Sequence, residues 1–304
     1  MNDIACQDLG FGITCIDAGY VQPGLACFYL LQEGDECAVI ETGTRHSLAA
    51  LLQLLERKGI DPERVRYVIP THVHLDHAGG AGAMMQVFPN AQLLIHPRGA
   101  RHMSDPERLI AGAMEVYGES AFDRLYGEII PVDARRIREL GDGERVALGG
   151  RPLEFRHTPG HARHHFCVWD AKSRGWFSGD MFGVSYSWFR FSTGDFLLPS
   201  TTPTQFEPQE YLASLQLLAG YDPERVYLTH YGERAYSQGK AELLAQQVEA
   251  YCDLAMANTD SDDLQGVLED YGAGLLRPFA GDMPESEMRS LLRFDMPLNA
   301  QGLA

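Results

Sequence analysis

The segment Thr71-His72-Val73-His74-Leu75-Asp76-His77 concentrates side chains that can bind a metal ion. Three imidazoles and one carboxylate fall within six residues, and Gly79-Gly80 follow. Neutral imidazole and carboxylate are ligands that zinc and similar first-row cations prefer. The apolar run 65–70 predicts a short buried strand just before the segment, and a helix is expected after it, through Met85. The spacing therefore predicts a metal site on a strand-to-helix loop.

Three later segments each end a predicted strand on a histidine or an aspartate. Thr158-Pro159-Gly160-His161 presents its histidine at the tip of a Pro-Gly turn. Ser178-Gly179-Asp180 and Thr229-His230 end two further strands. Several strands of one sheet can supply side chains to a single site. We therefore expect His161, Asp180 and His230 to lie beside the first cluster.

The rest of the chain predicts alternating strands and helices around these segments. Strands are expected at 11–18, 25–32, 36–42, 92–96, in 137–157, and at 166–170, with a hairpin turn at 33–35. Leu48, Leu51, Leu52 and Leu55 predict one apolar helix face. Residues 98–127 predict one or two inserted helices, either capping a site or simply packing. Further helices are expected at 240–256, 261–272 and 284–294.

Composition limits the classes of function. The 304-residue chain carries a net charge of -17, which disfavours binding to nucleic-acid phosphates. No apolar run is long enough to cross a membrane, and no signal peptide is visible. The six cysteines form no C-x-x-C pair, so reduced, packed cysteines are expected. We expect a cytoplasmic protein that acts on a small molecule, without nucleic-acid or membrane partners.

The ordered series T-H-x-H-x-D-H, T-P-G-H, S-G-D and T-H resembles the metallo-β-lactamase superfamily over roughly residues 10–235. The resemblance implies an α/β fold with four layers, an αββα sandwich, and a dinuclear metal site at one edge. We expect a catalytic domain over 1–237, with 98–127 as a helical insertion, and a helical extension over 238–304. The extension could shield the site, form a homodimer interface or complete the core.

The resemblance also implies a division of the ligands. His72, His74 and His161 would bind the first metal, Asp76, His77 and His230 the second, and Asp180 would bridge both. Zinc is the expected metal, with iron or manganese as alternatives. Two such ions acidify a shared water, and the resulting hydroxide can attack a carbonyl or phosphoryl centre. Asp76 could also orient the nucleophile or carry a proton.

Asp180 resembles the bridging aspartate of glyoxalase II, acyl-homoserine lactonases and the thioesterase-like quinolone-signal response proteins. We therefore expect a hydrolase that cleaves a small thioester, lactone or carboxylic ester. A phosphodiesterase and a weakly active regulatory or binding protein remain alternatives. Oxygen chemistry at a single iron also remains open.

Residues 186–203 begin with an aromatic run that directly follows Asp180. These aromatics could line an apolar pocket for an acyl or aryl group, or could plug the core. Tyr186 is a candidate catalytic residue, since it or Tyr231 could donate to an oxyanion. Arg190 could hold an acidic substrate group or form a surface ion pair. His164 or His165 could support a ligand imidazole from behind.

Overall fold

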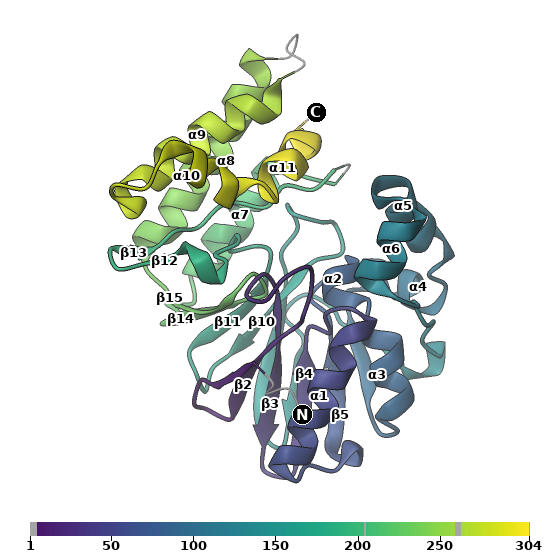
Figure 1. The fold of residues 1–304 in the computed structure, drawn as a ribbon. Helices are drawn as coiled ribbons and strands as arrows, with labels where there is room; N and C mark the ends of the chain where they lie inside the picture. The colour runs from purple at the N-terminus through teal and green to yellow at the C-terminus, as the bar shows by residue number, and fades with distance from the viewer. Residues whose placement is uncertain (1–4, 204, 259–262, 304) are drawn as a thin grey trace.

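Two mixed β-sheets lie face to face, with helices outside them (Figure 1). The computed structural model describes residues 5–203, 205–258 and 263–303. The seven-stranded sheet has the order β1 to β7. Its strands are β1 (Cys6–Asp8), β2 (Ile13–Asp17), β3 (Cys27–Glu33), β4 (Glu36–Ile40), β5 (Val65–Ile69), β6 (Gln92–Ile95) and β7 (Ile137–Glu139).

The second sheet has six strands in the order β15-β14-β11-β10-β9-β8. They are β8 (Arg145–Leu148), β9 (Arg151–His157), β10 (Phe166–Asp170), β11 (Gly175–Gly179), β14 (Arg225–Leu228) and β15 (Gly232–Ala235). A separate ribbon pairs β12 (Arg190–Phe191) with β13 (Gly194–Asp195). The predicted strands are thus present, and the hairpin turn at Gly34-Asp35 joins Glu33 to Glu36 in register.

The helices follow the same alternation along the chain. The α-helices are α1 (Leu48–Lys58), α2 (Leu75–Ala78), α3 (Ala81–Val87), α4 (Pro97–Ser104), α5 (Glu107–Tyr117), α6 (Glu119–Tyr126), α7 (Pro208–Ala219), α8 (Gln238–Ala257), α9 (Leu264–Ala280), α10 (Glu285–Leu292) and α11 (Asp295–Leu303). Short 3-10 turns are η1 (Arg45–Ser47), η2 (Pro62–Arg64), η3 (Ala134–Arg136) and η4 (Ser187–Phe189). None of these described helices combines the length and apolarity that crossing a bilayer requires.

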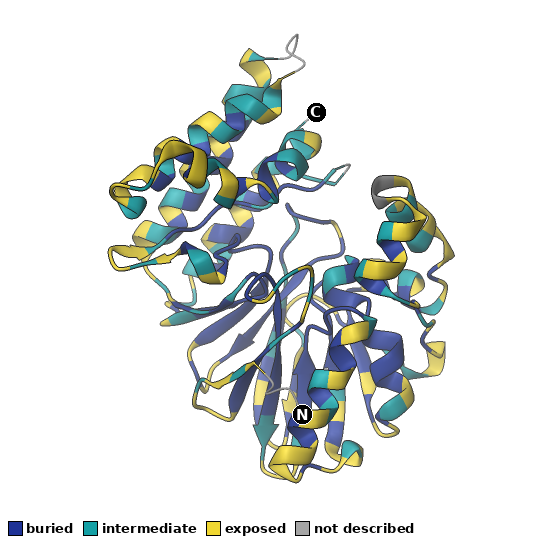
Figure 2. Cartoon of the chain, in the orientation of Figure 1, coloured by how far each residue is buried: buried dark blue, intermediate teal, exposed yellow. Residues whose placement is uncertain are grey.

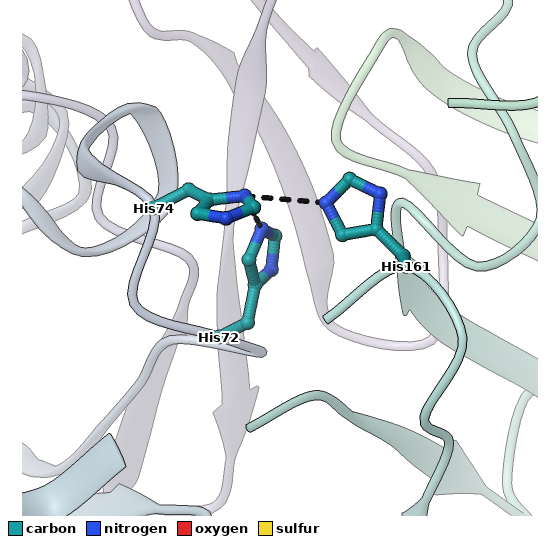
Figure 3. A group of neighbouring side chains, drawn as sticks. All are labelled: His72, His74 and His161. Carbon is teal, nitrogen blue, oxygen red and sulfur yellow. Dashed lines mark hydrogen bonds between the residues drawn. The ribbon is translucent and has the colours of Figure 1, made fainter. Parts of the chain in front are cut away.

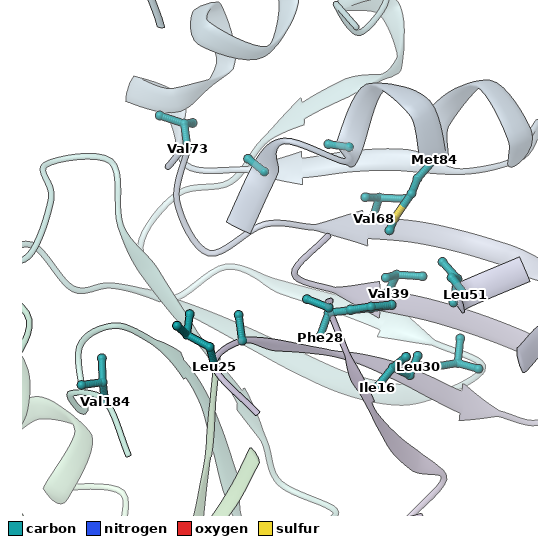
Figure 4. Packing of buried hydrophobic residues seen from close by; sticks show 14 of the residues in the cluster. Ile16, Leu25, Phe28, Leu30, Val39, Leu51, Val68, Val73, Met84 and Val184 are labelled. Atoms are coloured by element: carbon teal, nitrogen blue, oxygen red, sulfur yellow. The ribbon is translucent and has the colours of Figure 1, made fainter. Parts of the chain in front are cut away.

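Strand β3 explains why the sheets stack as a sandwich. Successive side chains of a strand point to opposite faces. Cys27, Tyr29 and Leu31 pack between the sheets, against Phe155 and Phe177 of the second sheet. Phe28 and Leu30 face outward, into the core that α1 and α3 cover (Figure 4). Both faces of the strand are therefore apolar and buried, as the dark strands in Figure 2 show.

The second sheet is covered in the same way on its outer side. Trp176, Val226 and Leu228 pack there against Tyr211 and Leu215 of α7, and against Leu244 and Val248 of α8. These contacts complete the four layers αββα, so the predicted fold class is confirmed. Helix α8 belongs to one of those layers although it lies beyond the predicted boundary at residue 237. That boundary falls in the loop between β15 and α8.

Two expectations about helices were wrong. The insertion at 98–127 forms three helices rather than one or two, because Pro106 and Gly118 each interrupt the pattern. Helix α9 continues to Ala280, past Gly272 and through Pro278, and α11 was not expected. Residues 261 and 262, where α9 was expected to begin, lie outside the described residues. Tertiary packing allows α9 to continue, since Gly272 lies against Leu292 and Met296.

Candidate metal centre

Loops at one edge of the sandwich bring the seven predicted ligand residues together. Strand β5 leads into the loop with His72 and His74, and α2 carries Asp76 and His77. His161, Asp180 and His230 follow the strands β9, β11 and β14. Strands β11 and β14 are parallel, so their carboxyl ends lie at the same edge. The side chains form three overlapping groups whose ligand atoms lie within 4.8 Å of one another.

The first group contains His72, His74 and His161 (Figure 3). Nδ1 of His74 lies 2.8 Å from Nε2 of His72 and 3.2 Å from Nε2 of His161. Burial and the neighbouring His161 lower the pKa of His74 to about 3. Burial likewise lowers the pKa of the other two imidazoles. The three rings are therefore neutral at physiological pH, the form in which histidine binds a metal.

The second group contains Asp76, His77 and His230. Oδ2 of Asp76 lies 3.3 Å from Nε2 of His230 and 3.6 Å from Nε2 of His77. Burial disfavours the charged imidazole of His230, but Asp180 and Asp76 outweigh it and raise its pKa to about 9. Without a metal, this group is an ion-paired cluster. A cation bound here would replace protons on its imidazoles.

Asp180 lies between these two groups and forms the third group with His72 and His77. Its Oδ2 is 3.3 Å from Nε2 of His161, whereas its Oδ1 is 3.3 Å from Nε2 of His77. Burial would raise the pKa of this carboxyl, but the His77 and His161 imidazoles hold it well below its usual range. Each carboxylate oxygen thus faces a different group, which suits a ligand shared by two cations.

The donor set fits divalent cations. Nε2 of His77 and Oδ1 of Asp180 are buried and face each other at 3.3 Å, but neither makes a hydrogen bond of good geometry. A buried polar atom without a partner is costly, unless a bound ion satisfies it. Imidazole nitrogens and carboxylate oxygens suit zinc, iron and manganese. The described residues could therefore hold two ions, and the identity of the metal is a separate question.

Comparison with known proteins assigns the family. Residues 23–230 match the model of the metallo-beta-lactamase superfamily, which is more than half of the chain. The chain belongs to this superfamily. The resemblance in the ordered histidine and aspartate motifs is therefore confirmed. Members of the superfamily generally bind divalent metals, in agreement with the donor groups described above.

Individual superfamily members are similar over most of the chain. The metallo-beta-lactamase fold-containing protein ST1585 of Sulfurisphaera tokodaii is 26% identical over 226 residues, which cover 73% of this chain and 78% of that protein. Its crystal structure superposes with a TM-score of 0.67 at 23% identity, covering 96% and 98%. The human acyl-coenzyme A thioesterase MBLAC2 is 29% identical over 213 residues, covering 62% and 70%.

The Nδ1 atoms of three ligand histidines make contacts that fix the orientation of their rings. Nδ1 of His161 donates to the Ser200 carbonyl (3.0 Å), and Nδ1 of His230 donates to the Leu25 carbonyl (2.9 Å). Nδ1 of His72 lies 3.0 Å from Oγ1 of Thr71. These contacts hold a proton on Nδ1 and direct Nε2 toward the metal position, where a cation would displace the second proton of His230.

Glu41 is a site residue that the sequence reasoning missed. It directly follows β4 and is 1% exposed. Its carboxylate accepts from the backbone N–H (3.0 Å) and hydroxyl (2.6 Å) of Thr71, from Nδ1 of His77 (3.0 Å) and from the hydroxyl of Thr229 (3.0 Å). One signal was available, since an acidic residue at a strand end repeats the pattern of Asp180.

His164 and His165 contact both the backbone of the ligand loops and the ligand rings, with the His165 ring centroid 4.9 Å from that of His72 and the His164 ring centroid 5.7 Å from that of His74. Nε2 of His165 accepts from the backbone N–H of Asp180 (3.3 Å), and Nδ1 of His164 accepts from that of Val73 (3.4 Å). Both side chains are buried. They support the loops that carry the ligands, so their role is indirect.

The aromatic segment after Asp180 packs mainly into the core. Phe189 and Phe196 are fully buried in the same cluster as Val184. Tyr186 is also buried, with its ring 6.0 Å from that of His230, and its hydroxyl donates to Oδ1 of Asp295 at 2.7 Å. The hydroxyl proton is donated to Asp295 in this structure, and donation by Tyr186 to an oxyanion stays a prediction.

Two other candidate substrate contacts point elsewhere. The Arg190 guanidinium donates to the Glu233 carbonyl (3.1 Å) and lies 3.7 Å from the Asp195 carboxylate. Tyr231 packs against the core between the sheets. Neither contact involves the seven clustered ligand residues.

Proposed function

We propose that this chain is a dinuclear metal-dependent hydrolase that cleaves a small thioester, lactone or carboxylic ester. The observation that carries the proposal is the position of Asp180 between two complete ligand groups, with one carboxylate oxygen facing each. A site that lacked one of these groups would instead have favoured a binding protein. We propose zinc as the metal and a small molecule as the substrate.

The bound ions would supply an acidified water as nucleophile and a Lewis acid for the substrate oxygen. The chain's own residues would arrange that chemistry. Asp180 would hold the two positions together, and the outer contacts of the imidazoles would keep each ring in place. The Asp76 side chain is 20% exposed, more than that of Asp180 at 7%. It is therefore the more accessible of these two carboxylates, and we propose that it takes up a proton next to an incoming substrate.

Two observations favour an ester-type bond. A human relative that is 29% identical over 213 residues carries the name acyl-coenzyme A thioesterase. The net charge of -17 disfavours polyanionic substrates such as nucleic acids. Localisation in the cytoplasm and a homodimer through the C-terminal helices remain predictions.

The test combines metal analysis with a substrate panel. The chain is purified without added metal, its metal content is measured, and a thioester, a lactone, an aryl ester and bis(p-nitrophenyl) phosphate are offered. We expect about two zinc ions per chain and turnover of a carbonyl ester. Asp180→Ala should lose both metal and turnover.

Three other results would each contradict the proposal and indicate a different function. Turnover of the phosphodiester alone would make the chain a phosphodiesterase. One iron per chain without hydrolysis would indicate oxygen chemistry. Two metals without turnover of any panel member would favour a regulatory or binding protein.

A further inference from the structure

One face of the C-terminal helix α11 carries two buried polar residues and a glycine. Asp295, Asn299 and Gly302 are spaced by four and three residues, so they lie on the same side of the helix. Asp295 is 7% exposed and Asn299 is 1% exposed. Polar side chains are seldom buried so completely unless they have specific partners.

The partner of Asp295 lies beside the second ligand group. Its Oδ1 accepts the Tyr186 hydroxyl at 2.7 Å. The Tyr186 ring meets the His230 ring edge to face, with centroids 6.0 Å apart. Helix α11 thus holds the Tyr186 hydroxyl, while the Tyr186 ring packs against the imidazole of the ligand His230.

The partners of Asn299 lie beside the first ligand group. Its Oδ1 accepts the backbone N–H of Thr201 (2.9 Å), and its Nδ2 donates to the Pro199 carbonyl (3.2 Å). Ser200 lies between these two residues, and its carbonyl accepts Nδ1 of His161 at 3.0 Å. One amide side chain therefore holds both sides of the residue that orients His161.

Gly302 allows the helix to approach that same loop. A Cβ atom at this position would lie 2.9 Å from the Thr201 carbonyl carbon and 2.9 Å from the Thr202 backbone nitrogen. Those atoms belong to the backbone and cannot rotate away. The Thr202 hydroxyl also donates to the His161 carbonyl at 2.6 Å. The helix therefore packs against residues 201 and 202, and Thr202 in turn contacts the backbone of the ligand His161.

We propose that α11 holds a ligand histidine of each metal position in place, with Asp295 and Asn299 as positioning residues. Asp295 holds His230 through Tyr186, and Asn299 holds His161 through the loop 199–202. Helix α11 then supports the metal site from outside, through Tyr186 and the loop 199–202. The inference rests on the two metal positions of the proposed function, but not on the choice of substrate.

The experiment measures zinc binding to the metal-stripped full chain by calorimetry, with a competing chelator. His161→Ala and His230→Ala each remove one ligand, so they identify which binding event belongs to which position. Loss of a residue that orients a metal ligand commonly weakens metal affinity 10- to 100-fold. We expect Asp295→Ala to weaken the His230 event about tenfold, and Asn299→Ala to weaken the His161 event about tenfold.

Three variants separate positioning from general damage. Asp295→Asn keeps an oxygen that can accept the Tyr186 hydroxyl, so it should recover most of the affinity that alanine loses. In a Tyr186→Phe background, Asp295→Ala should add little, because the hydrogen bond is already absent. Gln301→Ala changes an exposed residue of the same helix and should leave both events unchanged.

Several results would overturn the proposal. These are unchanged zinc affinity in both alanine variants, equal weakening of both events in each variant, and equal losses in Asp295→Asn and Asp295→Ala. A wild-type chain that binds two zinc ions but cleaves no panel substrate would refute the proposed hydrolase. The role of α11 in zinc binding would still be decided by the affinities of the variants. A wild-type chain that binds fewer than two would refute both.

Discussion

Glu41 shows how a single carboxylate can hold several parts of a metal centre. It accepts hydrogen bonds from Thr71, which precedes His72, from the ligand His77, and from Thr229, which precedes His230. These contacts join α2, the end of β5 and the end of β14. Because every donor points at a buried carboxylate, replacing that group affects several ligands together.

We expect Glu41→Gln to weaken zinc binding about 10- to 100-fold and to lower stability by about 1–3 kcal/mol. The new amide NH₂ cannot accept, so at least one of the four donors loses its partner. Chelator competition and urea unfolding measure the two effects. Wild-type zinc affinity in this variant would show that Glu41 has no positioning role.

At the scale of elements, the turn after β9 determines where His161 lies. Gly160 has φ +128°, and a Cβ atom there would lie 2.3 Å from the backbone nitrogen of Tyr211 in α7. The turn therefore packs directly against the helix. Gly150, in the β8–β9 hairpin, also has positive φ (+90°) but has nothing within 4 Å of its Cβ position.

Substitutions at these two glycines distinguish the cost of a strained backbone, which both would have, from the cost of a steric clash, which only Gly160 would have. Gly150→Ala should cost about 1–2 kcal/mol in the free energy of unfolding and leave metal binding unchanged. Gly160→Ala should cost about 1–3 kcal/mol more, since backbone must move, and should also weaken zinc binding at His161. Urea unfolding and zinc titration test both. Equal effects of the two substitutions would argue against the packing explanation.

For the whole molecule, the ligand groups couple metal binding to folding. Seven ligand residues from four segments come together only in the folded chain. A ligand that binds only the folded state adds about 2.7 kcal/mol of stability at 100 times its Kd. Added zinc should therefore raise the melting temperature, and a chelator should lower it. Asp180→Ala should show a much smaller rise; a full rise would rule out the shared ligand.

The burial of Asp295 makes stability depend on pH. Burial raises its pKa to about 7 from an ordinary 3.8, although Tyr186 and His230 act in the opposite direction. The unfolded chain releases this proton at lower pH, so stability falls as pH rises from about 4 to about 7 and then levels. Asp295→Asn removes this loss. The metal-free variant should gain up to about 4 kcal/mol over wild type across that window.

Urea unfolding of both metal-free proteins at pH 4.5 and pH 7.5 measures this difference. Other titrating groups are common to the two chains and cancel in the comparison. A stability difference that stays constant between the two pH values would mean that Asp295 is ionised in the folded chain at pH 4.5.

The ligand residues and the order of the strands were predictable because their signals are local. His72 to His77 lie in one stretch of six residues, and His161, Asp180 and His230 each follow a short apolar strand. Strands and the residues at their ends can be read from patterns of a few residues. The ordered motifs then indicated the sandwich as a whole.

The supporting contacts depended on tertiary structure, because they join residues far apart in the chain. Tyr186 and Asp295 are 109 residues apart, and Glu41 and Thr229 are 188 apart. Helix α11 includes Pro297 and Asn299, which have low helix propensity, so local patterns did not predict it. Its buried contacts with the loop 199–202 form only in the folded chain. The sequence thus determined which residues can bind the metals, whereas the packing of distant segments decided what holds them in place.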